Sequence, residues 1–282
     1  MDLSVIIVSW QSREKLRANL KALFNSQGDF TYEVFVVDNN SNDGTVAMVQ
    51  TEFSQVHLIS NLENLGFAKA NNQAISKTKG DYILLFNPDM LVGGDTLFKA
   101  LSWAKNNQQA VVSGFKLTDQ NQNIIKQVRK FPTLLDQLAV VLKIPHFLPS
   151  VLDKYLVKNF DYEKTAKVDS IRGAFFLINK KRWQEISGEN FPLLDERYFI
   201  WFEEVDFCKQ VYQRGGEVWY SPEATCVDYV GFSFNQVSIK TKQIYIRDSM
   251  LKYFRKWHKT WEYNLLKVAW CLVTSVIKIF VK

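Results

Sequence analysis

Apolar and polar residues occur in alternating blocks over the first 120 residues of the chain. Short, nearly continuous apolar runs of strand length occur at 3–9, 33–38, 56–60, 81–86 and 110–113. The stretches between them, at 13–25, 45–53, 67–78 and 95–107, have the period of amphipathic helices. Apolar runs without internal alternation indicate strands that are covered on both faces, as in a parallel sheet. The pattern therefore predicts an α/β fold with a doubly wound, Rossmann-like, mostly parallel central sheet.

The pattern changes after residue 120. Residues 121–167 carry prolines and scattered charges, which predicts an irregular lid or insertion. There follow a strand-like run at 172–179, an acidic and aromatic block at 194–206, a helical stretch to 214 and two short strands near 218–220 and 225–228. From residue 237 onward the pattern is that of long helices. We therefore divide the chain into segments 1–120, 121–235 and 236–282.

Polar side chains gather where the predicted parallel strands end, which is where such sheets bind ligands. The clusters are Ser9-Trp10, the run Asp-Asn-Asn-Ser-Asn-Asp-Gly at 38–44, the stretch 61–66, and Asn87-Pro88-Asp89. Local turns and a helix cap explain part of the run at 38–44. Two carboxylates and three amides exceed what a cap needs, so the run also indicates nucleotide recognition. Asp89 is suited to a hard divalent cation that shares its other sites with phosphate oxygens.

A second acidic cluster follows an aromatic run. Glu203, Glu204 and Asp206 come directly after Tyr-Phe-Ile-Trp-Phe at 198–202. Acids at the start of a helix are favoured by its dipole, which is the simpler interpretation. A carboxyl with apolar neighbours also has a raised pKa and can act as a general base near neutral pH. The pattern alone leaves both interpretations open.

The composition, with 47% hydrophobic and 23% charged residues, excludes a disordered chain. The three cysteines (208, 226 and 271) are far apart and form no C-x-x-C pair. This excludes a disulfide framework and a zinc ribbon, and it predicts a reducing compartment. Because the chain opens without the basic and apolar regions of a secretory signal, we expect a cytoplasmic protein.

The net charge of +6 is concentrated in the last segment. From residue 240 to the end there are ten lysines and arginines but only two acids. This segment therefore has a net charge of +8, and the rest of the chain is slightly acidic. That distribution is not typical of a nucleic-acid-binding domain, and we expect no nucleic-acid partner.

The tail itself is apolar around most of a helical circumference, with polar residues in one narrow arc. The arc contains Asn264, Lys267, Thr274, Ser275, Lys278 and Lys282. Its longest stretch without a charge, 268–277, is far shorter than the roughly 20 residues of a membrane span. Such a helix must be buried in the core, in a homodimer or in a lipid interface. Basic residues interleaved with aromatic ones at 252–261 favour an anionic membrane surface.

Several motifs occur together in a recognisable order. They are SVIIVSWQ, VVDNNSNDGT, NLGFAKANNQAI, LLFNPDM, RGAFFLI and LDERYFIWFEEVDFCKQVYQRGG. Over about residues 1–255 the chain resembles bacterial family-2 glycosyltransferases, and within them the rhamnosyltransferase-like branch that builds O-antigen and other surface polysaccharides. The resemblance implies a GT-A fold, an inverting sugar transfer and a Mg²⁺ or Mn²⁺ cofactor. It makes 1–120 the nucleotide-sugar-binding half and 121–235 the acceptor-binding and catalytic half.

The resemblance also assigns roles to individual residues. Glu204 matches the acid that usually serves as base, with Glu203 and Asp206 beside it, and Asp89 matches the metal ligand. The family often has His-x-x-Gly-x-Ser late in the fold, where this chain has Asp228-Tyr229-Val230-Gly231-Phe232-Ser233, so a metal-binding role for Asp228 is in doubt. The implied donor-binding residues are Ser9, Trp10, Asp38, Asn40, Asp43, Asn64, Lys69, Asn71 and Asn87. The candidate acceptor-binding residues are Asp195, Glu196, Tyr198 and Trp201.

The expected activity is transfer of a sugar from a nucleotide diphosphate to a saccharide or lipid-linked saccharide, on the inner face of the cell membrane. L-rhamnose from dTDP-rhamnose is favoured by the resemblance alone, and UDP-hexose or UDP-galactofuranose is the alternative. A nucleotidyltransferase would usually have a glycine-rich loop after the first strand, which is absent at 9–13. A non-catalytic sugar-nucleotide-binding subunit would have no need of acids at both Asp89 and Glu204.

Overall fold

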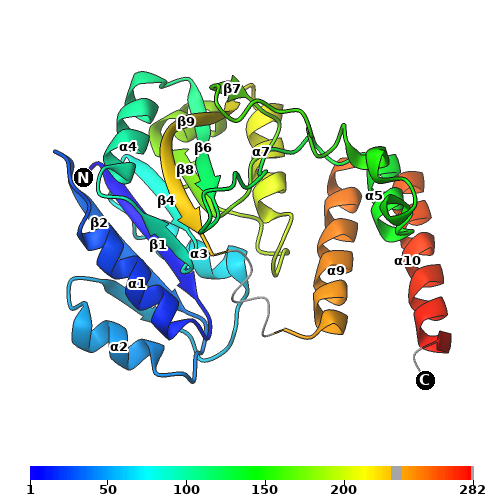
Figure 1. Cartoon of the computed structure of the whole chain (residues 1–282), viewed down its shortest axis with the longest axis horizontal. Helices are drawn as coiled ribbons and strands as arrows, with labels where there is room; N and C mark the ends of the chain where they lie inside the picture. Colours follow the sequence, from blue (N-terminus) through cyan, green and yellow to red (C-terminus); the bar gives the residue numbers. More distant parts are fainter. Residues whose placement is uncertain (230–236, 281–282) are drawn as a thin grey trace.

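The computed structural model describes residues 1–229 and 237–280, and the side chains of the last helix as far as Val273. The late-motif residues from Val230 to Ser233, and the side chains of Thr274, Ser275, Lys278 and Lys282, therefore lie outside the described part. The core is a mixed nine-stranded sheet with strand order β3-β2-β1-β4-β8-β6-β9-β5, and β7 pairs with β9 (Figure 1). The strands are β1 (Leu3–Ser9), β2 (Tyr32–Asp38), β3 (His57–Ser60), β4 (Tyr82–Phe86), β5 (Met90–Val92), β6 (Ala110–Thr118), β7 (Ala166–Lys167), β8 (Phe175–Asn179) and β9 (Glu217–Asp228).

Strand direction agrees with the expected α/β class. The strands β1, β2, β3 and β4 run parallel, and β6 runs parallel to β9. The strand β8 lies antiparallel between β4 and β6, and β5 and β7 are antiparallel to β9. Because β8 and β9 come from residues beyond 120, one continuous sheet spans the first two sequence segments.

Helices cover both faces of this sheet, which explains the continuous apolar runs. Along β1, Val5 and Ile7 pack against α1, α2 and α4, whereas Ile6 between them packs with α3, α6 and α7 on the other face. Successive strand side chains point to opposite faces, so a strand covered on both sides needs no polar positions. These helices are α1 (Arg13–Phe24), α2 (Thr45–Glu52), α3 (Phe67–Ile75), α4 (Thr96–Asn106), α6 (Lys180–Ser187) and α7 (Glu203–Gln213).

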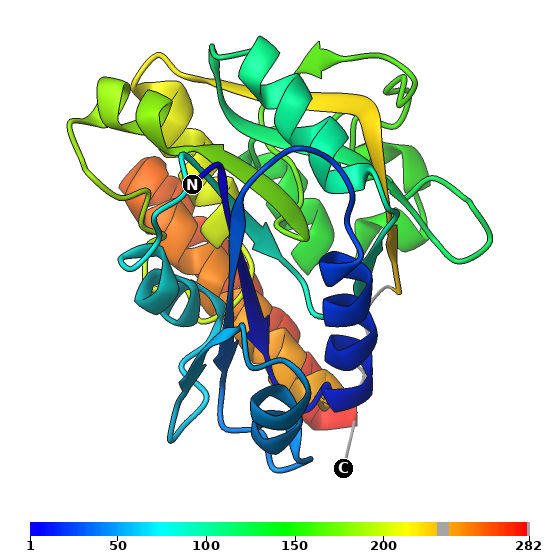
Figure 2. The same ribbon diagram turned by 90° about the vertical axis from the view of Figure 1, so that its left-hand side faces the viewer.

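A helical layer made by α5 (Leu134–Val141), α9 (Ile239–Trp257) and α10 (Thr260–Phe280) lies beside the sheet (Figures 1 and 2). A separate apolar cluster holds it together, with Leu134, Met250, Phe254, Leu266 and Trp270 among its members. The prediction that 121–167 is irregular was therefore wrong at α5. That helix begins with a reciprocal capping box between Thr133 and Asp136, and two short 3₁₀ turns follow it at Ile144–His146 and Pro149–Leu152.

Other boundaries also differ from the sequence pattern. The two short strands expected near 218–220 and 225–228 form one long strand, β9, with an irregular register against β6. The short strand β5 and the helix α6 were not foreseen.

The tail is helical, as predicted, but it does not stand alone. Leu266, Ala269 and Trp270 are buried against α9 and α5, so core packing takes up part of the apolar circumference. Of the basic and aromatic residues at 252–261, Tyr253 and Phe254 are also buried. Within residues 1–229 and 237–280, no helix combines the length and hydropathy of a membrane span.

Candidate functional site

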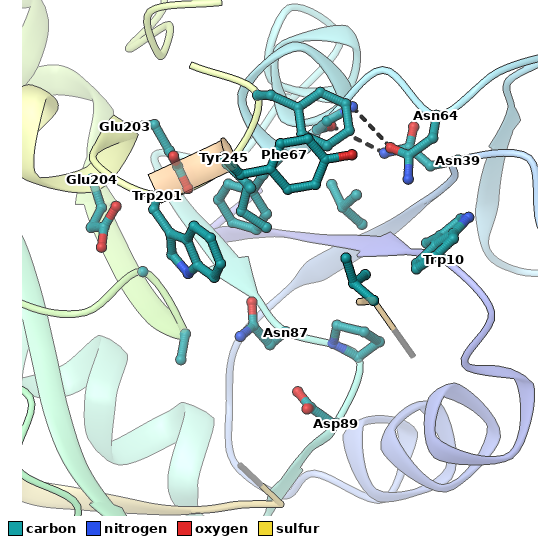
Figure 3. A pocket seen from close by; sticks show the side chains of 18 of the residues that line it. Trp10, Asn39, Asn64, Phe67, Asn87, Asp89, Trp201, Glu203, Glu204 and Tyr245 are labelled. Carbon is teal, nitrogen blue, oxygen red and sulfur yellow. Dashed lines mark hydrogen bonds between the residues drawn. The ribbon is translucent and has the colours of Figure 1, made fainter. Parts of the chain in front are cut away.

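A cavity of about 460 Å³ opens where β1, β2 and β4 end (Figure 3). This is the edge of a parallel sheet at which helix-covered folds bind ligands. Its walls come from the strand ends, from the loop that leads into α3, from the segment before β8, from the start of α7 and from the start of α9. The lining residues named below are Trp10, Asn39, Asn64, Phe67, Asn87, Asp89, Arg172, Trp201, Glu203, Glu204, Ser238, Thr241 and Tyr245.

The loop before α3 is fixed to the opposite wall of the cavity. Asn39 Nδ2 donates to the Gly66 carbonyl and Gly66 N donates to Asn64 Oδ1, each at 3.0 Å. Phe67 N donates to the Phe199 carbonyl at 2.7 Å. Gly66 has φ +81°, and a Cβ on it would lie 2.3 Å from the Phe199 oxygen. A glycine is therefore required here, because a side chain would separate the two walls.

The acidic and amide run at 38–44 is first of all a turn. Asp38 is buried, and its Oδ2 accepts from Ser41 N at 2.8 Å. Asp43 accepts from Arg13 N at 2.9 Å and from the Thr45 hydroxyl at 2.6 Å, so it fixes the starts of two helices. Burial acts to raise the pKa of Asp43, but the hydrogen bonds from Thr45 and Arg13 outweigh it and lower that pKa.

Of the nine implied donor-binding residues, Trp10, Asn64 and Asn87 line the cavity. The other six do not: Ser9, Asp38, Asn40, Asp43, Lys69 and Asn71 lie beneath the loops or on the surface. Ser9 bonds Ser12, and Asn71 Nδ2 donates to the Phe67 carbonyl at 2.9 Å. Asn39, which the sequence interpretation passed over, takes the position in the cavity that we had expected for its neighbours.

Asp89 lines the cavity, and Asp228 lies close to it on the next strand. Met90 pairs with Asp228 across β5 and β9, and Tyr229 N donates to the Asp89 carbonyl at 3.1 Å. The Asp228 side chain is 1% exposed and forms an ion pair of 2.8 Å with Arg172 Nη1. Among the described residues no group of three or more His, Cys, Asp or Glu could hold a metal ion. Asp89 fits Mg²⁺ or Mn²⁺ through its hard oxygen ligands, provided that a diphosphate supplies others, while Arg172 already balances the charge of Asp228.

The acids at the start of α7 follow two residues in an unusual backbone conformation. Trp201 and Phe202 have φ of +64° and +70°, a region that large side chains rarely adopt. Such strain persists only where surrounding structure imposes it, and it is common at functional sites. The result is that Glu203 and Glu204 face the cavity (Figure 3). Gly173 lies opposite, where a Cβ would be in contact with Glu204.

These two carboxyls do not titrate normally. Burial raises the pKa of Glu203 well above its ordinary value, and the charge of Glu204 raises that pKa further. Burial also raises the pKa of Glu204, but the Arg172 guanidinium opposes this effect. Glu204 therefore ionises first and Glu203 keeps its proton to higher pH. A carboxyl whose pKa is raised and that faces a cavity is suited to accept a proton near neutral pH.

Asp206 and most of the expected acceptor residues lie outside the cavity lining. Asp206 is fully buried and accepts from Lys256 Nζ at 2.7 Å, Trp257 Nε1 at 2.6 Å and the Tyr198 hydroxyl at 3.2 Å. Asp195 pairs with Lys256 at 2.9 Å and with Arg197, and Glu196 accepts from Asn72. Of the four expected acceptor residues, Trp201 alone is among the residues that line the cavity.

This network also corrects the interpretation of the basic residues at 252–261. Lys256 points inward to Asp195 and Asp206, and Lys252 Nζ donates to the Arg197 carbonyl. Interleaved basic and aromatic residues look the same in sequence whether they face a lipid headgroup or a buried acid. The acids lie some 50 residues away, so no local pattern could have revealed the pairing.

Arg172, Tyr245, Ser238 and Thr241 were not foreseen at the cavity. Arg172 belongs to the run RGAFFLI, where an arginine directly before a strand was a signal without an assigned role. The three residues of α9 gave no such signal, because a helix far along the chain can only be placed at the cavity by the fold.

Comparison with known proteins identifies the family. Residues 4–183 match the family model described as glycosyl transferase family 2. The chain belongs to this family. Over 233 residues this glycosyltransferase is 24% identical to the rhamnosyltransferase WbbL of Escherichia coli (strain K12), a match that covers 80% of this chain and 82% of that one. Over 212 residues it is 23% identical to the N-acetylglucosaminyl-diphospho-decaprenol L-rhamnosyltransferase of Mycobacterium tuberculosis, covering 71% and 67% of the two chains.

A shorter match is 35% identical over 116 residues to the uncharacterized glycosyltransferase YfnE of Bacillus subtilis, and it spans 40% of this chain and 30% of YfnE. Solved structures confirm the GT-A fold. S. aureus TarS superposes with a TM-score of 0.56 at 17% identity, over 92% of this chain and 44% of that one. The Pyrobaculum calidifontis mannosyltransferase PcManGT, in complex with GDP-Man and Mn²⁺, superposes with a TM-score of 0.58 at 15% identity, over 96% and 69%.

Proposed function

We propose that this glycosyltransferase moves L-rhamnose from dTDP-rhamnose, with inversion, to a saccharide or lipid-linked saccharide in the synthesis of a surface polysaccharide such as O-antigen. The observation that carries the proposal is that one cavity has Asp89 on one wall and, on another, the buried Glu203 beside the half-buried Glu204 (Figure 3). The choice of rhamnose is supported by WbbL and the mycobacterial enzyme, both of which are named as rhamnosyltransferases.

The donor would occupy the cavity from Trp10 to Asp89. The Trp10 ring offers an apolar face to the nucleoside, and the amides of Asn39 and Asn64 offer hydrogen bonds at the ends of β2 and the α3 loop. Asn87 and Asp89 would lie at the diphosphate, where a bound Mg²⁺ or Mn²⁺ would neutralise the leaving group. We assign Ser9, Asp38, Asn40, Asp43, Lys69 and Asn71 to support of the surrounding loops.

Glu204 is the proposed base. It takes the proton of the acceptor hydroxyl as the hydroxyl oxygen bonds to the anomeric carbon and the bond from that carbon to the diphosphate oxygen breaks. Arg172 favours the carboxylate form of Glu204, which this step needs. Glu203, which holds its proton longer, would donate a hydrogen bond to a substrate oxygen. Trp201 would pack against the acceptor sugar, while Asp195, Glu196, Tyr198 and Asp206 hold the surrounding segment in place.

We further propose that the protein is peripheral on the inner face of the cell membrane. Trp261, Leu265, Val268 and Leu272 stay exposed on α10 after its other side has packed, with 59% of Trp261 and 61% of Leu272 accessible. At 100° per residue these four side chains fall within an arc of about 60°. An aromatic and aliphatic stripe within the basic C-terminal segment suits an anionic lipid surface, and a homodimer is the alternative occupant.

A panel of nucleotide sugars tests the proposed reaction. The full chain is incubated with dTDP-rhamnose, UDP-hexoses, UDP-galactofuranose and GDP-mannose, with Mg²⁺, Mn²⁺ or chelator, and release of nucleoside diphosphate is measured. We expect metal-dependent release from dTDP-rhamnose above the other donors. Preference for another donor would reject rhamnose as the transferred sugar and would assign the chain to a different branch of the family. Binding without release from any donor, with acceptor mixtures present, would favour the non-catalytic subunit.

A further inference from the structure

A second cavity of about 260 Å³ adjoins the first. The two share Arg172, Trp201 and Glu204 in their walls, and the rest of the second wall comes from segments 126–129, 170–171 and 202–205, with Tyr155 and Ile246. Glu204 can therefore be reached from either cavity. If the donor sugar occupies the first cavity, a molecule in the second can present its hydroxyl to the same carboxylate.

The second cavity carries an excess of positive charge. Lys126, Arg129 and Arg172 line it, and Glu204 is the one acid among the described lining residues. Because Arg172 is paired with Asp228, the excess comes from Lys126 and Arg129. Within the described part of the chain, neither Lys126 nor Arg129 has a carboxylate oxygen within 4.0 Å, although nearby Lys130 pairs with Asp169 at 3.3 Å. Lys126 Nζ donates to the Lys158 carbonyl at 3.3 Å, and Arg129 Nη1 donates to the Val128 carbonyl at 2.7 Å.

Uncompensated cations in a concave site attract an anion, because the low-dielectric walls concentrate their field. A guanidinium binds phosphate oxygens through parallel N–H bonds, and an ammonium adds a point charge. Neutral sugars need neither. The wall charges therefore distinguish an acceptor that carries phosphate from one that does not.

The surroundings of the second cavity add an apolar component. Tyr155 lies beside Gln137 of α5. The outer side of α5 and the turns after it expose Leu135, Leu142, Phe147 and Leu148, with 77% of Leu135 and 90% of Phe147 accessible. The helical segment that carries these exposed side chains thus contacts the cavity wall through Gln137 and Tyr155.

We propose that the second cavity binds a phosphate or diphosphate that the acceptor carries next to its reacting sugar, through Lys126 and Arg129. The assignment rests on the proposed function, because it places the acceptor hydroxyl at Glu204. A lipid carrier and a polyol phosphate would both supply this group, and the apolar surface of α5 favours the lipid carrier.

Direct binding to the full chain, by titration calorimetry without donor, tests the site. The ligands are a sugar diphosphate on a short alkyl chain, the alkyl glycoside of the same sugar and chain length, and a ribitol phosphate oligomer. We expect at least tenfold tighter binding of the diphosphate than of the glycoside, since charge-assisted hydrogen bonds are stronger than neutral ones. Tighter binding of the ribitol phosphate than of the lipid diphosphate would assign the anion to a polyol phosphate.

Variants locate the anion. In the double variant Lys126→Gln, Arg129→Gln we expect the preference for the phosphorylated ligand to fall about tenfold or more. Lys130→Gln is the matched control for Lys126→Gln: it lies in the same segment, removes one positive charge in the same way and is outside the cavity lining. Lys126→Gln alone, at an exposed position, serves if the double variant does not fold. Equal binding of neutral and phosphorylated ligands, an unchanged preference in the variants, or an equal loss in Lys130→Gln would overturn the site.

The same reagents separate this inference from the proposed function. Transfer with the same kcat/KM to neutral and phosphorylated acceptors would reject the anion site but would still support the proposed transferase activity. A preference for phosphorylated ligands in a protein that transfers no sugar from any donor would support the anion site and reject the proposed transferase activity.

Discussion

Arg172 Nη1 lies 2.8 Å from Asp228 Oδ2, and this ion pair connects the two sides of the reaction site. Asp228 is buried at the end of β9, beside the strand that begins one residue after Asp89. The same guanidinium lowers the pKa of Glu204 against the effect of burial. One cation therefore balances the acid that the family resemblance made a metal ligand and also favours the charged form of the proposed base.

The pH dependence of transfer should report this role of Arg172. Because the reaction needs Glu204 as a carboxylate, the rate rises with pH through its raised pKa. Removing the positive charge raises that pKa further, so Arg172→Gln should shift the acidic limb of log kcat to higher pH. Arg172→Lys, which keeps the charge, is the control and should shift the limb less. The same limb in wild type and Arg172→Gln would mean that Arg172 does not set the ionisation of the base.

Exchanging each acid for its amide should distinguish Glu204 from Glu203. Glu204→Gln keeps the shape but cannot accept a proton, so donor binding should survive while kcat falls by about 10²–10⁴. Glu203→Gln keeps a hydrogen-bond donor and should lose much less. Asp206→Asn should lower the melting temperature rather than kcat alone, because it weakens the bonds to Lys256 and Trp257. Full activity of Glu204→Gln beside an inactive Glu203→Gln would reverse the two assignments.

Metal titrations should separate Asp89 from Asp228. Asp89→Asn removes a proposed ligand, so the loss of activity should exceed the about 10–100-fold typical of an outer-shell partner, and a higher Mg²⁺ or Mn²⁺ concentration should be needed for half activity. Asp228→Asn removes the partner of Arg172, and we expect its half-saturating metal concentration to stay within about twofold of wild type. A similar rise of the half-saturating metal concentration in both variants would indicate that Asp228 is a second metal ligand.

Stability should depend on pH through Glu203. Its pKa is raised in the folded protein, so the native state binds more protons than the unfolded state between the two pKa values. The free energy of unfolding therefore falls as pH rises from the ordinary glutamate range through the raised pKa. In Glu203→Gln the side chain cannot ionise, so this fall in the free energy of unfolding does not occur. The melting temperature of the variant relative to wild type should therefore increase from pH 5 to pH 8. A difference that is constant over this range would show that Glu203 is not held protonated.

Surface variants test membrane docking better than removal of the tail would. Deleting 261–282 would also remove Leu266, Ala269 and Trp270 from the core. The variant Trp261→Ser, Leu265→Ser, Leu272→Ser changes the exposed side alone and should abolish co-sedimentation with anionic vesicles while leaving the melting temperature nearly unchanged. Leu62→Ser, which replaces an exposed apolar side chain outside α10, is the control. If the α10 variant changes a dimer to a monomer, the stripe is a subunit interface.

The elements that local pattern foresaw are strands with nearly uniform burial and the amphipathic helices α1 to α4 between them. The runs at β1, β2 and β4 are nearly continuously apolar because helices cover both faces, and they were placed to within about one residue. By contrast α5 buries Leu134 and Ala139 while exposing Leu135, and its prolines lie just outside it, so composition concealed a short helix.

The site was foreseen in part, for a similar reason. Asp89, Glu203 and Glu204 carry chemistry that residue type and position reveal, and all three line the cavity. The run at 38–44 did not reveal which of its polar residues faces inward, because a turn and a binding loop use the same residues. Arg172 and Tyr245 reach the cavity through sheet order and helix docking, neither of which is encoded in a short stretch of sequence.

The N-cap of α9, Ser238, lies beside the donor cavity, and two residues separate the end of this helix from the start of α10. Its 19 residues make a helix about 28 Å long, and Lys256 near its end is bonded to Asp195 and Asp206. The catalytic cavity and the outer stripe of α10 are therefore held at a set distance and angle, unlike two modules on a flexible linker. Once α10 rests on a surface, the height and tilt of the cavity above that surface are determined, and with them the length of acceptor that can reach Glu204.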